Sequence, residues 1–207
     1  MATVALIGNK GGTGKTTLAL NLGSGLLRRA PTVLLDADPQ RSALQWHANS
    51  DGGVPEVVGA SEDLETQIAQ ARDRYANVVI DCPPSILAPQ LRAALKVCEL
   101  AVVPVQPSPV DLWANASVEE VVEEMWQVNP GLSAVLVVNQ LEPRTILSRL
   151  ARDAMAELNL PAAQTSIRRR AVYRWSALEG KSVYQMGKRG SAAAAEMDQL
   201  IDEVIER

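Results

Sequence analysis

The first thirty residues combine an apolar run, a glycine-rich loop and a helical pattern, and this combination constrains the fold most. The run "TVALIG" (3–8) predicts a buried strand, and the stretch 16–29 predicts a helix that begins at the loop. Between them, "NKGGTGK" supplies three glycines, whose missing side chains let the backbone wrap closely around a ligand. Backbone N–H groups and the dipole at a helix start both attract an anion. The segment therefore predicts a phosphate-binding loop in an α/β fold.

Strand-like runs and helical patterns alternate along the rest of the chain. Further strands are predicted at 32–36, 55–60, 77–81, 100–105 and 132–139, with a weaker one at 162–167. Helices are predicted at 61–75, with Ser61 as N-cap, and at 111–128, 145–158 and 192–205. Most strand runs are continuously apolar, which is typical of a parallel sheet covered on both faces. We therefore expect a single α/β domain over residues 1–207, a doubly wound, mostly parallel sheet flanked by helices.

The loop contains the residue types that a nucleoside triphosphate with magnesium requires. Lys15 is expected to reach the β- and γ-phosphates, and the Thr16 hydroxyl is expected to bind Mg²⁺. The strict pattern G-x-x-x-x-G-K-[ST] is not met, because Asn9 stands where its first glycine belongs. The other residues predicted to contact the nucleotide are Gly11, Gly12, Thr13, Gly14 and Thr17.

Three aspartates stand at the ends of two predicted strands. Asp36 and Asp38 lie in "LLDADPQ", and Asp81 ends "VVID". Ligands of an open parallel sheet bind beyond the carboxyl ends of its strands, so we expect these acids beside the loop. Asp81 is predicted to hold Mg²⁺ through water, Asp36 to support the metal shell, and Asp38 to orient the attacking water. Any one of them alone would be read as a turn or cap residue.

Composition is that of a soluble globular protein with reduced thiols. Apolar residues make up 47% of the chain and charged residues 21%. No apolar run approaches the roughly 20 residues that span a bilayer, and "MATVALIG" lacks the basic start of a signal peptide. Cys82 and Cys98 lack metal-ligand spacing and are expected to be buried, reduced thiols. We therefore predict a cytoplasmic protein.

Basic residues gather in one segment of an otherwise acidic chain. The net charge is −4, yet seven basic residues and one acid lie between positions 168 and 189. This patch favours a confined anionic partner, although a solvated helix face is the common alternative. Arg170 and Arg174 are expected about one turn apart on one helix face. Tyr173 and Trp175 are expected to pack beneath that face, with stacking on a nucleic acid as the alternative. The residues predicted to contact DNA are Arg168, Arg169, Arg170, Arg174 and Lys181.

Four motifs, "KGGTGKTT", "LLDADPQ", "VVIDCPP" and "VVPVQPSPVDLWA", together resemble the deviant Walker A class of ATPases, the ParA/MinD family. The resemblance covers essentially the whole chain, and the length is similar to the small ParA type that partitions plasmids or positions carboxysomes. It implies ATP and Mg²⁺ as ligands and slow hydrolysis, with Lys10, Lys15 and Asp38 as catalytic residues. It also implies a sandwich homodimer with ATP, in which Lys10 crosses to the partner's nucleotide, and a contact of Asn139 with adenine. Gly8 departs from the family, where asparagine is usual.

The function that this resemblance implies is an ATPase that binds non-specific duplex DNA on the nucleoid and positions a cargo. An adaptor protein is expected to stimulate its hydrolysis. A MinD-like ATPase that cycles on membranes is one alternative, but it needs a basic amphipathic C-terminal helix. The tail "AAAAEMDQLIDEVIER" has five acids and one arginine, which disfavours a membrane partner. A metabolic enzyme of the same fold is a further alternative, and fold alone does not decide.

Overall fold

The computed structural model describes residues 2–143, 145 and 159–205. The predicted helix 145–158 lies outside the described residues except at its first position. Within the described part, one six-stranded sheet has the strand order β3-β2-β4-β1-β5-β6, and every pairing in it is parallel. Its strands are β1 (Ala2–Leu6), β2 (Thr32–Asp36), β3 (Glu56–Gly59), β4 (Asn77–Asp81), β5 (Leu100–Val105) and β6 (Ser133–Val138).

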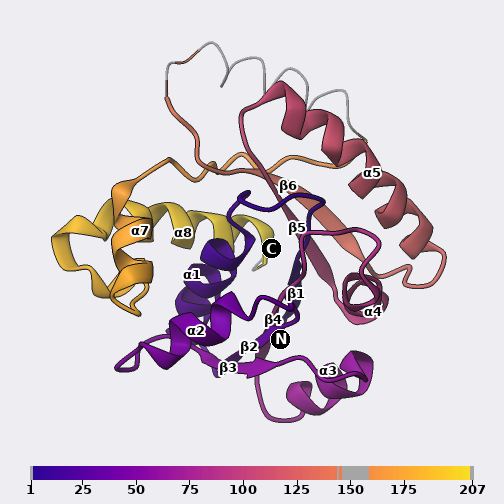
Figure 1. Cartoon of the computed structure of the whole chain (residues 1–207), viewed down its shortest axis with the longest axis horizontal. Helices are drawn as coiled ribbons and strands as arrows, with labels where there is room; N and C mark the ends of the chain where they lie inside the picture. Colours follow the sequence, from indigo (N-terminus) through magenta and orange to yellow (C-terminus); the bar gives the residue numbers. More distant parts are fainter. Residues whose placement is uncertain (1, 144, 146–158, 206–207) are drawn as a thin grey trace.

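Helices cover both faces of this sheet, which gives the three layers seen in Figure 1. One face carries α3 (Leu64–Arg72), α4 (Pro89–Val97) and α5 (Pro109–Trp126). The other carries α1 (Lys15–Leu27), α2 (Ser42–Ala48), α7 (Ala171–Leu178) and α8 (Ser191–Val204). Two short 3-10 helices, η1 (Val183–Gln185) and η2 (Gly187–Arg189), join α7 to α8. The predicted doubly wound, parallel α/β fold is confirmed.

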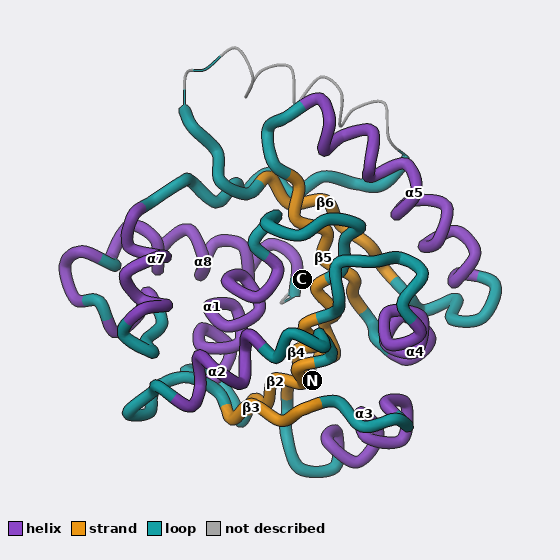
Figure 2. Tube along the Cα trace, viewed as in Figure 1, coloured by secondary structure: helices purple, strands orange, loops and turns teal. Residues whose placement is uncertain are grey.

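Neighbouring residues of the strands other than β3 enter two separate cores. Ile80 of β4 packs in the core beneath α3, α4 and α5, whereas Val79 packs in the core beneath α1, α2, α7 and α8. Both side chains are fully buried, and burying one such side chain stabilises the fold by roughly 1.5–3 kcal/mol. A strand whose side chains are buried on both faces of the sheet needs apolar residues at consecutive positions. Figure 2 shows the strands enclosed between the two helical layers.

The helix that follows β3 begins later than Ser61 suggests. Asp63 is its N-cap, because Asp63 Oδ1 accepts a hydrogen bond from the backbone N–H of Thr66 at 3.1 Å. The Ser61 hydroxyl instead donates to the carbonyl of Asp63 at 2.8 Å. The prediction of Ser61 as N-cap was wrong, because both residue types suit that position and only the backbone path selects one.

The weakly predicted strand at 162–167 was also wrong. This segment runs beside β6, but it forms isolated bridges and not a continuous strand. The bridges join Leu136 with Ala162 and Leu141 with Arg168.

Two helices that the sequence patterns did not predict are α2 and α4. The seven-residue helix α2 has no side-chain cap, and its N-cap Arg41 adopts the left-handed region at φ 53°, so its start lacks the usual sequence signal.

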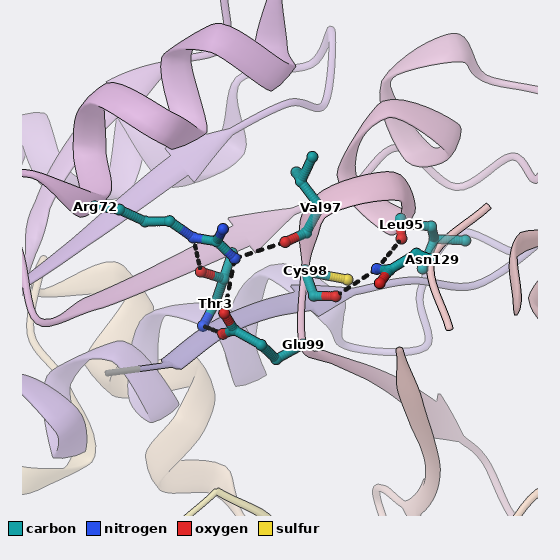
Figure 3. Close-up of polar contacts among 7 residues, drawn as sticks. All are labelled: Thr3, Arg72, Leu95, Val97, Cys98, Glu99 and Asn129. Carbon is teal, nitrogen blue, oxygen red and sulfur yellow. Dashed lines mark hydrogen bonds and ion pairs between the residues drawn. The ribbon is translucent and has the colours of Figure 1, made fainter. Parts of the chain in front are cut away.

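A charged network joins elements at the amino-terminal edge of the sheet (Figure 3). Arg72 at the end of α3 donates to Thr3 Oγ1 at 2.7 Å, to the carbonyl of Val97 at 2.6 Å and to Glu99 Oε1 at 2.8 Å. Glu99 Oε2 also accepts the backbone N–H of Thr3. The network ties α3 to the starts of β1 and β5, at the sheet edge opposite the glycine loop.

Both cysteines are buried and unbridged, as predicted. Burial raises the pKa of Cys98 to about 12 and raises that of Cys82 well above its usual range, so both are neutral thiols near pH 7. Asn129 donates to the carbonyls of Leu95 and Cys98 at 2.9 and 2.8 Å, which closes the turn between α4 and β5 (Figure 3).

Candidate nucleotide site

The carboxyl ends of three adjacent strands meet the glycine-rich loop. In the parallel register, Asp81 of β4 is level with Leu6 of β1 on one side and with Asp36 of β2 on the other. The loop follows β1 and leads directly into α1 at Lys15. Because neighbouring strands lie about 5 Å apart, the sheet itself brings these two acids to the loop. This is the juxtaposition that the sequence predicted.

Side-chain amides from the ends of β5 and β6 hold the loop. Asn139 Nδ2 donates to the carbonyl of Thr13 at 2.7 Å. Gln106 and Gln140 both donate to the carbonyl of Gly12, at 2.7 and 3.1 Å. These bonds fix the direction of two loop carbonyls. Gln140 was missed by sequence reasoning, although it follows an apolar strand run directly, as the predicted acids do.

Two loop glycines adopt backbone conformations that other residues avoid. Gly12 has φ 81° and Gly14 has φ 92°, both in the left-handed region. A Cβ at Gly14 would lie 2.4 Å from Asn139 Nδ2, so a side chain there would displace the Asn139 amide from the loop. Nothing lies within 4 Å of a Cβ at Gly11 or Gly12, so the outer side of the loop faces open space that an anion can enter.

Lys15 places a buried ammonium group at this loop. Its Nζ donates to the carbonyl of Lys10 at 2.8 Å, and the residue is 6% exposed. Burial lowers the pKa of Lys15, and the carboxylates of Asp81 and Asp38 raise it in part. A poorly hydrated cation beside open backbone amides binds phosphate more strongly than a solvated one.

Asp81 is a buried carboxylate that lacks its normal partners. It is 1% exposed, and neither of its oxygens has a hydrogen-bond partner of normal geometry within the described residues. Burial raises the pKa of Asp81 to about 7, while the nearby Thr16 hydroxyl and Lys15 ammonium lower it in part. An isolated buried carboxylate is unfavourable unless a cation or a proton neutralises it. Asp81 therefore has unmet capacity for a cation.

The oxygen donors near this carboxylate fit magnesium. Mg²⁺ is held by few protein oxygens, with water and substrate phosphates completing its octahedral shell. The Thr16 hydroxyl and the Asp81 carboxylate are such a pair. No cluster of three or more His, Cys, Asp or Glu side chains suited to a metal occurs in the described part of the chain. A site with one carboxylate and one hydroxyl agrees with a metal bound together with its nucleotide.

Asp36 and Asp38 shape the loop between β2 and α2. Asp36 Oδ2 accepts the N–H of Leu44 at 3.0 Å, and its Oδ1 accepts the N–H of Asp38 at 3.2 Å. Asp38 Oδ1 accepts the N–H of Gln40 at 2.9 Å. Burial raises the pKa of Asp36, and these backbone bonds lower it in part. Asp36 therefore lies beside Asp81 but turns both oxygens to backbone amides, and its metal role stays a prediction.

Two adjoining cavities border the loop and share Gly14, Thr17 and Gln140. The first, of about 400 Å³, contains charged groups, and its lining includes Gly11, Gly12, Lys15, Thr16 and Asp38. The second, of about 240 Å³, has a largely apolar wall, and its lining includes Leu18, Asn139, Ile167, Tyr173 and Ala177. A charged cavity beside an apolar one suits a nucleotide, whose phosphates and base have opposite requirements.

Of the five residues predicted to contact DNA, the four arginines line the second cavity, and acids neutralise most of the five. Four of the five form ion pairs: Arg168 with Glu196 (3.5 Å), Arg169 with Glu142 (2.7 Å), Arg170 with Glu196 (2.5 Å) and Lys181 with Glu179 (2.8 Å). Arg174 is exposed and forms no ion pair among the described residues. Their role in binding DNA stays a prediction.

Two expectations about this segment were wrong. Arg170 is the N-cap of α7 with extended backbone, and its side chain turns to Glu196 on α8. It therefore does not share a helix face with Arg174. Tyr173 is buried as expected, at 8% exposure, but Trp175 is 57% exposed, because the core lies on the other side of α7.

The fold and the loop define a nucleotide-binding protein of the P-loop class, in which strand, glycine loop, lysine and helix follow one another. A family model described as "CobQ/CobB/MinD/ParA nucleotide binding domain" matches residues 4–183, and the chain belongs to this family. It has the nucleotide-binding ATPase fold of that family, and the resemblance noted from the four motifs is confirmed.

Two curated relatives are similar over nearly their whole length. The chain is 40% identical to "Maintenance of carboxysome distribution protein A" of Halothiobacillus neapolitanus, covering 98% of this chain and 96% of that protein. It is 31% identical to the protein of the same name from Gloeobacter kilaueensis, covering 97% and 93%.

A solved structure shows the same fold with ligands present. Cobyrinic acid a,c-diamide synthase of Mycobacterium smegmatis, with a bound ATP analogue and magnesium, superposes with a TM-score of 0.78 at 20% identity. The match covers 98% of this chain and 94% of that one. Within the described ranges of our chain, none of the helices has the length and apolar character needed to cross a bilayer.

Proposed function

We propose that this protein is a Mg²⁺-dependent ATPase of the ParA type that positions carboxysomes by cycling on DNA as an ATP-dependent dimer. The observation that carries the proposal is the pair of buried ionisable groups, Lys15 and Asp81, at a glycine loop that borders a cavity with charged lining and an apolar cavity. The two relatives named for carboxysome distribution support the choice of cargo, because the similarity extends over nearly the whole chain.

Each residue of the site has a chemical task in this proposal. Lys15 and the loop amides bind the β- and γ-phosphates, and Asn139 meets adenine in the apolar cavity. Thr16 and Asp81 hold Mg²⁺, which neutralises charge between the phosphates when it is bound. Asp38 accepts a hydrogen bond from the water that attacks the γ-phosphate. No arginine lines the phosphate cavity among the described residues, so hydrolysis is slow until an adaptor protein stimulates it.

Dimerisation and DNA binding follow from the same site. The side chain of Lys10 reaches the partner's nucleotide and neutralises charge in a poorly solvated interface. Arg168, Arg169, Arg170, Arg174 and Lys181 contact DNA phosphates, and a dimer doubles the number of these contacts. DNA binding therefore depends on ATP and places the protein on the nucleoid.

The test is a titration of Mg-ATP into wild-type protein and into a Lys15→Ala variant. The variant should lose at least about 100-fold in affinity, because a buried charge-assisted phosphate contact is removed. Lys96→Ala is the matched control, since Lys96 pairs with Glu65 on the α3–α4 side of the sheet. Equal ATP affinity in wild type and Lys15→Ala would refute the proposal.

A further inference from the structure

A short segment at the end of β6, residues 139–142, connects the glycine loop to the arginine run, which is Arg168, Arg169 and Arg170. Asn139 and Gln140 donate to the carbonyls of Thr13 and Gly12, as described above. The next residue, Leu141, pairs with the arginine segment through its backbone, because its N–H donates to Ile167 and its carbonyl accepts from Arg169, both at 3.0 Å. Consecutive residues thus contact the loop at one end and the arginine run at the other.

The fourth residue of this segment forms an ion pair with an arginine. Arg169 Nη1 lies 2.7 Å from Glu142 Oε1. Arg169 also borders the apolar cavity, and together with Glu142, Gln106 and Gln140 it borders a further cavity of about 190 Å³. Arg169 therefore lies between the loop, the apolar cavity and the protein surface.

A second acid holds the neighbouring arginine more firmly. Glu196 of α8 accepts from Arg170 Nη2 at 2.5 Å and Nε at 3.2 Å, and from the backbone N–H of Arg168 at 3.3 Å. The side chains of Arg170 and Glu196 are 28% and 13% exposed, whereas those of Arg169 and Glu142 are 60% and 53% exposed. An exposed ion pair is weak, and removing one partner from a buried pair is costly. Of the two, the pair with Glu142 is the one that opens readily.

We propose that Glu142 masks Arg169 in the nucleotide-free and ADP-bound protein, and that ATP bound at the loop shifts segment 139–142 and releases Arg169 to a DNA phosphate. This inference rests on the proposed function and adds a regulatory element to it. Without ATP, a DNA phosphate must displace the Glu142 carboxylate before it binds Arg169, which lowers affinity for DNA. With ATP, the amide contacts of Asn139 and Gln140 to the loop readjust, and the backbone hydrogen bonds of Leu141 transmit the change to Arg169.

The test is the Glu142→Gln variant, titrated with labelled duplex DNA at several salt concentrations, with ATP and with ADP. Its DNA affinity with ADP should rise about two- to fivefold, which is the range expected for losing one exposed ion pair. The slope of log affinity against log salt should steepen by about 0.9, for one additional phosphate contact. With ATP, affinity should match the wild type. The ratio of DNA affinity with ATP to DNA affinity with ADP should therefore be lower in the variant than in the wild type.

Two comparisons distinguish the masking of Arg169 by Glu142 from a general effect of removing one negative charge. Glu62→Gln removes one negative charge at an exposed position in the loop before α3, and it should leave DNA affinity unchanged. In a double-variant cycle, adding Arg169→Gln should cancel the gain from Glu142→Gln, whereas adding Arg174→Gln should lower affinity equally with and without Glu142.

The results separate this inference from the function on which it rests. If wild-type protein binds DNA with ATP but Glu142→Gln matches it with ADP, the mask is refuted and the proposed function stands. An equal gain from Glu62→Gln, or a gain that persists without Arg169, refutes the mask as well. If wild-type protein with ATP binds no DNA, the DNA step of the proposed function fails, and the mask fails with it.

Discussion

The Asn139 side chain packs against the backbone at Gly14, although 125 positions separate the two residues in the sequence. The Asn139 side chain donates to the carbonyl of Thr13 at 2.7 Å, and its Nδ2 lies only 2.4 Å from the position of a Cβ on Gly14. The same side chain therefore supports the loop and would have to be displaced by any side chain at position 14. The left-handed φ of Gly14 adds a second, independent requirement for glycine.

Gly14→Ala is therefore expected to destabilise the protein and abolish ATP binding. The substitution combines a strained φ with a steric clash, so we expect a loss of about 2–4 kcal/mol in the free energy of unfolding. Gly11→Ala is the matched control, because it meets open space, and it should leave stability within about 0.5 kcal/mol. Urea unfolding of both variants measures this, and equal stability would contradict the structure.

Asp81→Asn is expected to stabilise the nucleotide-free protein at alkaline pH while impairing Mg²⁺-dependent hydrolysis. Burial raises the pKa of Asp81 from 3.8 to about 7, so the folded state favours the protonated acid. The stability contribution of that proton is present below about pH 4 and is lost as pH rises from 4 to 7. The asparagine variant stays neutral and should gain on the order of 2–4 kcal/mol over wild type at pH 8. A difference that is the same at pH 4.5 and pH 8 would show that titration of Asp81 is not its cause.

Asp38→Ala should bind ATP but hydrolyse it at least about 100-fold more slowly, leaving a persistent dimer. A group that orients or deprotonates an attacking water contributes about this much. Asp38→Asn separates chemistry from loop shape, since its carbonyl oxygen can still accept the Gln40 N–H. Both variants should be slow in a phosphate-release assay. Wild-type turnover in the asparagine variant would remove Asp38 from the water-positioning role.

Lys10→Ala should bind ATP as a monomer. The bond from Lys15 goes to the backbone carbonyl of Lys10, so the substitution keeps the loop contact and removes only the side chain. ATP affinity should stay within about threefold of wild type, while light scattering with ATP should show no dimer. A dimer of wild-type stability would mean that Lys10 does not act across the interface.

Arg72→Ala should lower stability without changing the nucleotide site. It removes the hydrogen bonds to Thr3, Val97 and Glu99 at the far edge of the sheet, which together stabilise by about 1–3 kcal/mol after allowance for partial exposure. ATP affinity should equal that of wild type at temperatures where the variant is folded. Weakened ATP binding there would show that the two edges of the sheet are coupled.

The sequence by itself determined the six sheet strands and most of the long helices, the parallel α/β fold and the identity of the loop. Apolar runs, glycines and strand-end acids act locally, so "TVALIG" and the following loop predicted a phosphate site without knowledge of the rest. The juxtaposition of Asp36 and Asp81 was predictable as well, because parallel strands end at one edge.

Only the tertiary structure decided which side chains form hydrogen bonds with the loop carbonyls and which acids pair with the arginines. Asn139 and Gln140 reach loop carbonyls more than 120 residues away in sequence, and Glu196 pairs with arginines 26 and 28 residues earlier. The sequence showed seven basic residues close together, but the acids that pair with Arg168, Arg169 and Arg170 come from the end of β6 and from α8. Charge counts along a chain carry no information about such partners, because packing of distant elements sets which charges meet and how much water remains between them.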